Sequence, residues 1–149
     1  MSVFASERAR RVVEKWGPIE WTTDKGKMRL LFRNDGWLTQ EVKGQDDWCM
    51  VSEGMIAEFP LDAIGEKWLR EKLAERKVFV DGAPWGDGQP DMAYWVMQYA
   101  DRGAECLGGD GWVKAARWGP THEAVAFGTF AEGLLSAAEA CIAEEEKKA

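Results

Sequence analysis

The chain has 149 residues, 46% of them hydrophobic and 30% charged, a composition typical of a globular protein that builds its own core. Its formal net charge of −7 is unevenly placed: residues 1–77 carry 14 basic and 14 acidic side chains, whereas residues 78–149 carry 5 and 12. Contacts to nucleic-acid phosphates need lysine and arginine, so direct nucleic-acid binding is not expected. The acidic half favours a basic protein surface as its partner.

Compartment can also be predicted from the sequence. No run of 18 apolar residues is present, so no membrane contact is expected. The first 16 residues carry charges where a secretory signal has an apolar stretch, which argues against export. The three cysteines are odd in number and widely spaced, a pattern typical of reduced thiols. We therefore expect a cytoplasmic protein.

The first part of the chain is predicted to be a helix followed by strands. Residues 6–16 have apolar side chains at helical spacing, with Ser6 as the N-cap and Gly17-Pro18 as the end. Alternation of apolar and polar residues then predicts antiparallel strands joined by short turns. The strands are expected at 19–23, 27–33, 36–43 and 47–52, with 55–59 as a candidate fifth.

The second part is predicted to be mainly helical. An apolar stripe predicts a helix from Pro60 to about Arg76, and a short strand follows at 78–80. Residues 81–91 are rich in glycine and proline and are predicted to be a loop. Further elements are expected as a helix at 92–106, a strand at 112–118 and a long C-terminal helix capped by Thr121.

These elements predict an α+β fold, in which an antiparallel meander sheet of four or five strands is packed by three or four helices. The length predicts one domain over residues 1–149. The loop at 81–91, where the charge balance turns negative, is the candidate subdomain boundary.

Catalytic motifs do not stand out. His122 is the single histidine, so a Ser-His-Asp triad would have to use it, and a zinc site would have one imidazole at most. No GxSxG, HExxH, P-loop or GxGxxG motif occurs. We therefore assign no catalytic residue, no metal ligand and no cofactor, and the sequence leans away from an enzyme.

The leading hypothesis is a non-catalytic binding or inhibitor protein that docks an acidic surface on a basic partner. One version is a phage-type anti-defence inhibitor whose carboxylates stand in for the phosphates of nucleic acid. Trp85 is the candidate hot spot, since tryptophan is enriched at the energetic centres of interfaces. The acidic residues assigned to this surface are Asp81, Asp87, Asp91, Asp101 and Asp110.

Two alternatives belong to other functional classes. Trp37, Trp48 or Trp85 would form the stacking surface of a module that binds a sugar or a nucleotide, provided that the tryptophans of the sheet face solvent rather than the core. The second alternative is a carboxylate- or metal-dependent hydrolase built on the same aspartates. That chemistry depends on the separation of two carboxylates, which the sequence does not give.

Overall fold

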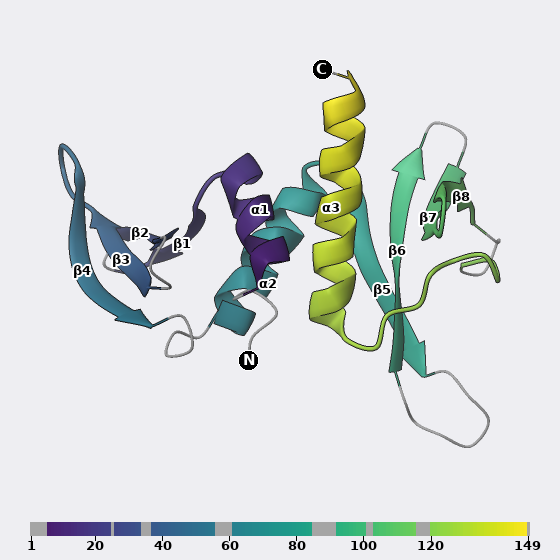
Figure 1. Ribbon diagram of the computed structural model, residues 1–149, viewed down its shortest axis with the longest axis horizontal. Coiled ribbons are helices and arrows are strands. Elements are labelled where there is room, and N and C mark those ends of the chain that lie inside the picture. Colours follow the sequence, from purple (N-terminus) through teal and green to yellow (C-terminus); the bar gives the residue numbers. More distant parts are fainter. Residues whose placement is uncertain are drawn as a thin grey trace. The chain divides into compact units, whose positions relative to one another are not determined.

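A computed structural model describes residues 6–24, 26–33, 37–55, 61–84, 92–100, 103–115 and 120–148 (Figure 1). Among them the order of elements is a helix, four strands, a helix, four strands and a helix. The chain divides into two compact units, Met1–Trp68 and Leu69–Ala149. The predicted α+β class with antiparallel strands is confirmed, but the strands form two four-stranded sheets where we expected one sheet.

Helix α1, Glu7–Trp16, forms as predicted. The Ser6 side chain accepts a hydrogen bond from the amide of Ala9 at 3.3 Å and so caps the first turn. Gly17 ends the helix with a φ of 90°, a conformation that favours glycine, and its amide donates to the carbonyl of Val13.

The first sheet is a meander of four antiparallel strands, β1–β2–β3–β4. One face supplies buried side chains, among them Ile19, Leu30 and Leu38, which are all 0% exposed. The opposite face is mainly polar, as the alternation predicted. The strands are β1 Ile19–Thr23, β2 Gly26–Phe32, β3 Trp37–Lys43 and β4 Trp48–Met55. Of the candidate fifth strand at 55–59, Met55 ends β4 and the rest lies outside the described residues.

Helix α2, Leu61–Ala74, agrees with its prediction to within two residues. It contributes to both units, because the boundary between them falls between Trp68 and Leu69, which are both buried. Lys77, with a φ of 62°, is the left-handed residue that leads from the helix region into the second sheet.

The second sheet, β5–β6–β7–β8, is also an antiparallel meander. The predicted helix at 92–106 is wrong, because these residues form β6, Met92–Ala100, and most of β7, Gly103–Gly108. The predicted loop begins too early, since β5 runs over Val78–Pro84, and the last strand is β8, Gly111–Lys114.

Helix α3, Phe130–Lys148, begins eight residues later than predicted. Its first turn is capped by Thr129, whose hydroxyl accepts from the amide of Glu132 at 3.2 Å. The residues before it are extended and join the sheet instead: Phe127 exchanges two main-chain hydrogen bonds with Tyr94 of β6. Helix α3 lies along one face of the second sheet (Figure 1), where Phe130 contacts the Tyr94 ring edge-on.

Candidate functional site

Two of the predicted acidic residues are described, and both are exposed on the second sheet. Asp81 lies in β5, where its carboxylate accepts a hydrogen bond from the amide of Gly82 at 2.9 Å. Asp110 lies in the tight turn between β7 and β8, which Gly111 closes with a φ of 131°. Neither carboxylate is buried, so each is available to a partner.

The second sheet places the two aspartates apart along its strands. Asp81 is the middle residue of β5, where it pairs with Trp95 of β6, whereas Asp110 lies in the turn that joins β7 to β8 at the Gly108–Gly111 pair. The two aspartates are also separated by β6 and β7. They do not face each other as the two carboxylates of a glycosidase would.

A third acidic residue, Glu123, lies beside the turn that carries Asp110, and it is not among the acidic residues expected from the sequence. It is exposed, and its neighbour Ala124 forms a bridge with Gly108 next to the β7–β8 turn. A helix capped by Thr121 would hold Glu123 in its first turn, away from the sheet. We call Asp110 and Glu123, together with Asp81 of β5, the acidic end.

The basic side chains at the ends of the described strands lie away from the acidic end. Lys77 precedes β5 and Lys114 ends β8, both at the opposite end of the sheet. Arg76 and Lys148 line a hollow there together with Glu144 and Glu145, and Arg76 pairs with Glu145 at 2.6 Å. The acidic end therefore has no basic side chain of its own sheet to neutralise it among the described residues.

Met92 is an exposed apolar side chain at the tip of the β5–β6 pair. It begins β6 opposite Pro84 and is 42% exposed. It lies three residues from Trp95, the partner of Asp81, so its side chain is on the other face of the sheet from that carboxylate.

The other predicted site residues lie outside the described part of the chain. Trp85, Asp87 and Asp91 belong to residues 85–91, which follow Pro84, and Asp101 belongs to residues 101–102. The described neighbours of Asp101, Ala100 and Gly103, pair with each other at the opposite end of the sheet.

The tryptophans of the first sheet do not make a continuous platform. Trp37 and Trp48 share the polar face but stand at opposite ends of the β3–β4 pair. Trp37 is 39% exposed. Trp48 is already engaged, because the Arg29 guanidinium lies 4.2 Å from its ring centre and is held by Glu41 at 2.6 Å.

His122 lies in a turn rather than at a helix N-terminus, contrary to the prediction, and its side chain is exposed. Cys49, Cys106 and Cys141 are free thiols. In the described part of the chain, no three His, Cys, Asp or Glu side chains come together in a way that could hold a metal ion. No described helix is long and apolar enough to cross a membrane.

Comparison with protein-family models, curated proteins and solved structures finds no match for this chain. The function proposed below therefore rests on the chain's own residues.

Proposed function

We propose that the protein is a non-catalytic binding protein or inhibitor that docks its acidic end on a basic surface of a partner. In the version that we favour, the partner surface is a groove that normally binds nucleic acid. Asp81, Asp110 and Glu123 would occupy the positions of phosphates. The cytoplasm is the compartment that we propose for this activity.

The observation that carries the proposal is the exposure of three carboxylates of the second unit away from the described basic side chains of its sheet. Asp110 and Glu123 lie at the β7–β8 turn and Asp81 lies at the middle of β5, whereas Lys77 and Lys114 lie at the other end of the sheet. Such a field increases the rate of encounter with a surface of opposite charge and falls with ionic strength.

The test compares the wild-type chain with the triple variant Asp81→Lys, Asp110→Lys and Glu123→Lys as baits in a cell lysate at low and moderate salt. We expect the wild-type chain to retain a basic protein at low salt and to release it at moderate salt. The triple variant should lose it, since each reversed charge now repels the partner.

A matched control separates the site from total charge. Reversing three exposed acids elsewhere, Asp46, Glu71 and Glu146, changes the net charge by the same amount. The control should keep the partner. Loss of the partner in both triple variants, or in neither, would contradict docking by the acidic end.

A second candidate function is a small-molecule module, and the exposure of Trp37 favours it. A sugar or nucleotide that stacks on Trp37 would change tryptophan fluorescence, and Trp37→Phe would abolish that change. A flat response of the wild type across a panel of sugars and nucleotides would eliminate this candidate.

A further inference from the structure

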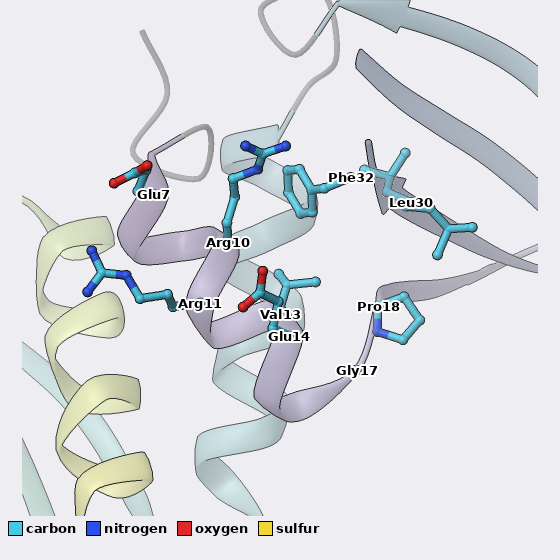
Figure 2. Close-up of a pocket in the computed structure, with 10 residues that line it drawn as sticks. Glu7, Arg10, Arg11, Val13, Glu14, Gly17, Pro18, Leu30 and Phe32 are labelled. Atoms are coloured by element: carbon cyan, nitrogen blue, oxygen red, sulfur yellow. The ribbon is translucent and has the colours of Figure 1, made fainter. Parts of the chain in front are cut away.

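The first unit contains a cleft of about 620 Å³ between α1 and β2 (Figure 2). Its volume lies in the range typical of ligand sites. Val13, Pro18, Leu30 and Phe32 provide an apolar lining, and charged side chains of α1 stand on the rim. Neither sequence analysis nor the acidic end accounts for it.

The cleft exists because β1 is shorter than its neighbour. The first residue of β1, Ile19, pairs with Leu30, so β2 continues for two more residues without β1 beside it. Gly17, which would stand opposite Phe32, turns away and donates to the carbonyl of Val13 at 2.9 Å. Among the described residues, the end of β2 is therefore an open strand edge.

The main chain of Phe32 faces this open edge. The amide of Arg33 donates to the carbonyl of Trp37 in β3 at 2.9 Å, so Arg33 points its main chain toward β3. Neighbouring residues of a strand point their hydrogen-bonding groups to opposite sides. Leu31 also borders the cleft although its side chain belongs to the other face, so main chain forms part of the wall.

Two opposite charges stand above the open edge, one turn apart on α1. Arg10 donates to the carbonyl of Arg33, and its guanidinium lies 5.9 Å from the Phe32 ring centre, which fixes its direction (Figure 2). Glu14 lines the same cleft. Within the described residues, no ion pair joins Arg10 to Glu14, although their i, i+4 spacing would permit one.

We propose that this cleft binds a short extended peptide segment of another protein, which continues the first sheet beside Phe32. Peptides that add a strand to a sheet edge gain affinity from main-chain hydrogen bonds and specificity from side-chain pockets. An apolar side chain would enter the lining of Leu30 and Val13. An acidic residue would pair with Arg10 and a basic residue with Glu14.

The test titrates the 15N-labelled 149-residue chain with two capped tripeptides, Ac-Lys-Leu-Asp-NH2 and its reverse, Ac-Asp-Leu-Lys-NH2, to millimolar concentration. The expected result is a saturable change in amide chemical shifts at Leu31, Phe32 and the adjoining turn of α1 with one of them. Arg10→Gln should weaken that peptide about fivefold to tenfold, because a charge-assisted hydrogen bond is lost. Glu14→Gln should weaken it similarly.

Two further peptides distinguish strand addition from simple charge attraction. A tripeptide with N-methylated leucine lacks the central main-chain donor and should bind much more weakly. The neutral Ac-Gln-Leu-Asn-NH2 should bind weakly and should not respond to Arg10→Gln. Unchanged dispersion of the amide spectrum would show that the variants fold.

Three results would overturn the proposal. The first is the absence of shifts at this cleft with either charged peptide. The second is equal binding of the N-methylated peptide. The third is binding of decanoate, an amphipathic carboxylate, without peptide binding, which would make the cleft a small-molecule site. Because the cleft and the acidic end use different residues, failure here leaves the proposed function standing.

Discussion

Burial raises the pKa of the Cys141 thiol in α3 from 9.0 to about 11; Arg76 lowers this pKa, and Glu145 and Glu144 raise it. In the unfolded chain the thiol ionises near its ordinary pKa. Between these two values the unfolded chain binds fewer protons than the folded one. The free energy of unfolding therefore falls as the pH rises from about 9 to about 11, and this thiol contributes no pH dependence below that window.

Cys141→Ala should remove this part of the alkaline loss of stability, on the order of 1 kcal/mol at the upper end of the window after allowance for solvent screening. Urea unfolding of the variant and the wild type across the window measures the difference in slope. Cys49→Ala is the control, because Cys49 is exposed and should leave the slope unchanged. Parallel slopes for Cys141→Ala and wild type would contradict the prediction.

At the scale of elements, the seating of α3 on β5 depends on a glycine. Gly133 is buried, and a Cβ added there would lie 2.9 Å from Cγ1 of Val80. Alanine favours a helix over glycine by about 1 kcal/mol, so the substitution would help at an exposed position. At Gly133 the close approach of Val80 should outweigh this gain in helix stability. We therefore expect Gly133→Ala to lower the free energy of unfolding by about 1–3 kcal/mol.

Chemical denaturation of the single and double variants tests this packing. Val80→Ala removes the obstructing methyl groups, so the double variant should lose less stability than the two single losses added together. Gly109→Ala is the matched control, because nothing lies within 4 Å of its added Cβ. A stabilised Gly133→Ala variant would mean that helix and sheet can separate without cost.

The strands of the first sheet could be predicted from the sequence because only one of its faces is apolar. In β3, Leu38 is buried while Trp37 and Thr39 on the other face are not, so the period of two is visible. In β6 both faces carry large apolar side chains: Trp95 and Met97 are buried on one, and Val96 on the other. Burial on both faces hides the alternation, and the spacing then imitates a helix.

The start of α3 was predicted too early for a different reason. Residues up to Phe127 are apolar enough to continue a helix, but they pair with Tyr94 and Gly108 of the second sheet. Pairing between segments so far apart in the chain leaves no local signal. Gly128, just before the helix, was the available warning, since glycine is unfavourable in a helix interior.

At the scale of the molecule, each unit contains a helix followed by a four-stranded meander. The sequence contains Asp-Gly-Trp twice, at residues 35–37 and 110–112, but the two copies do not mark equivalent positions in the two meanders. Trp37 begins the third strand of its sheet, whereas Trp112 lies in the fourth strand of the other. The resemblance lies in topology and cannot be predicted from these short sequence matches.

The acidic end could be predicted only in part at this scale. Uneven charge along the chain pointed to Asp81 and Asp110, and both are exposed. That Asp110 lies beside Glu123 depends on the bridge between Gly108 and Ala124, which joins segments distant in the chain. A helix over 92–106 and a helix capped by Thr121 would not form this bridge, so the sequence could not bring the two carboxylates together.

Helix α2 should couple the stability of the two units. It supplies buried Trp68 to the first and buried Leu69 and Leu73 to the second. If the first unit unfolds, the remaining turns of α2 are too short to persist without packing, because isolated helices below about 12 residues are marginal in water. The length-based prediction of a single domain then corresponds to one cooperative unfolding transition.

Leu38→Ala tests this coupling, since Leu38 is completely buried in the first sheet. The substitution should cost about 2–5 kcal/mol. If the two units unfold together, the free energy of protection against amide hydrogen exchange should fall by the same amount in β6 as in β2, although β6 lies in the other unit. Leu134→Ala in α3 is the reciprocal variant and should lower protection in β2 as well. If protection falls only in the unit that carries the substitution, the two units are instead independently folding domains. Helix α2, which joins them, would then not need to stay intact when one of them unfolds.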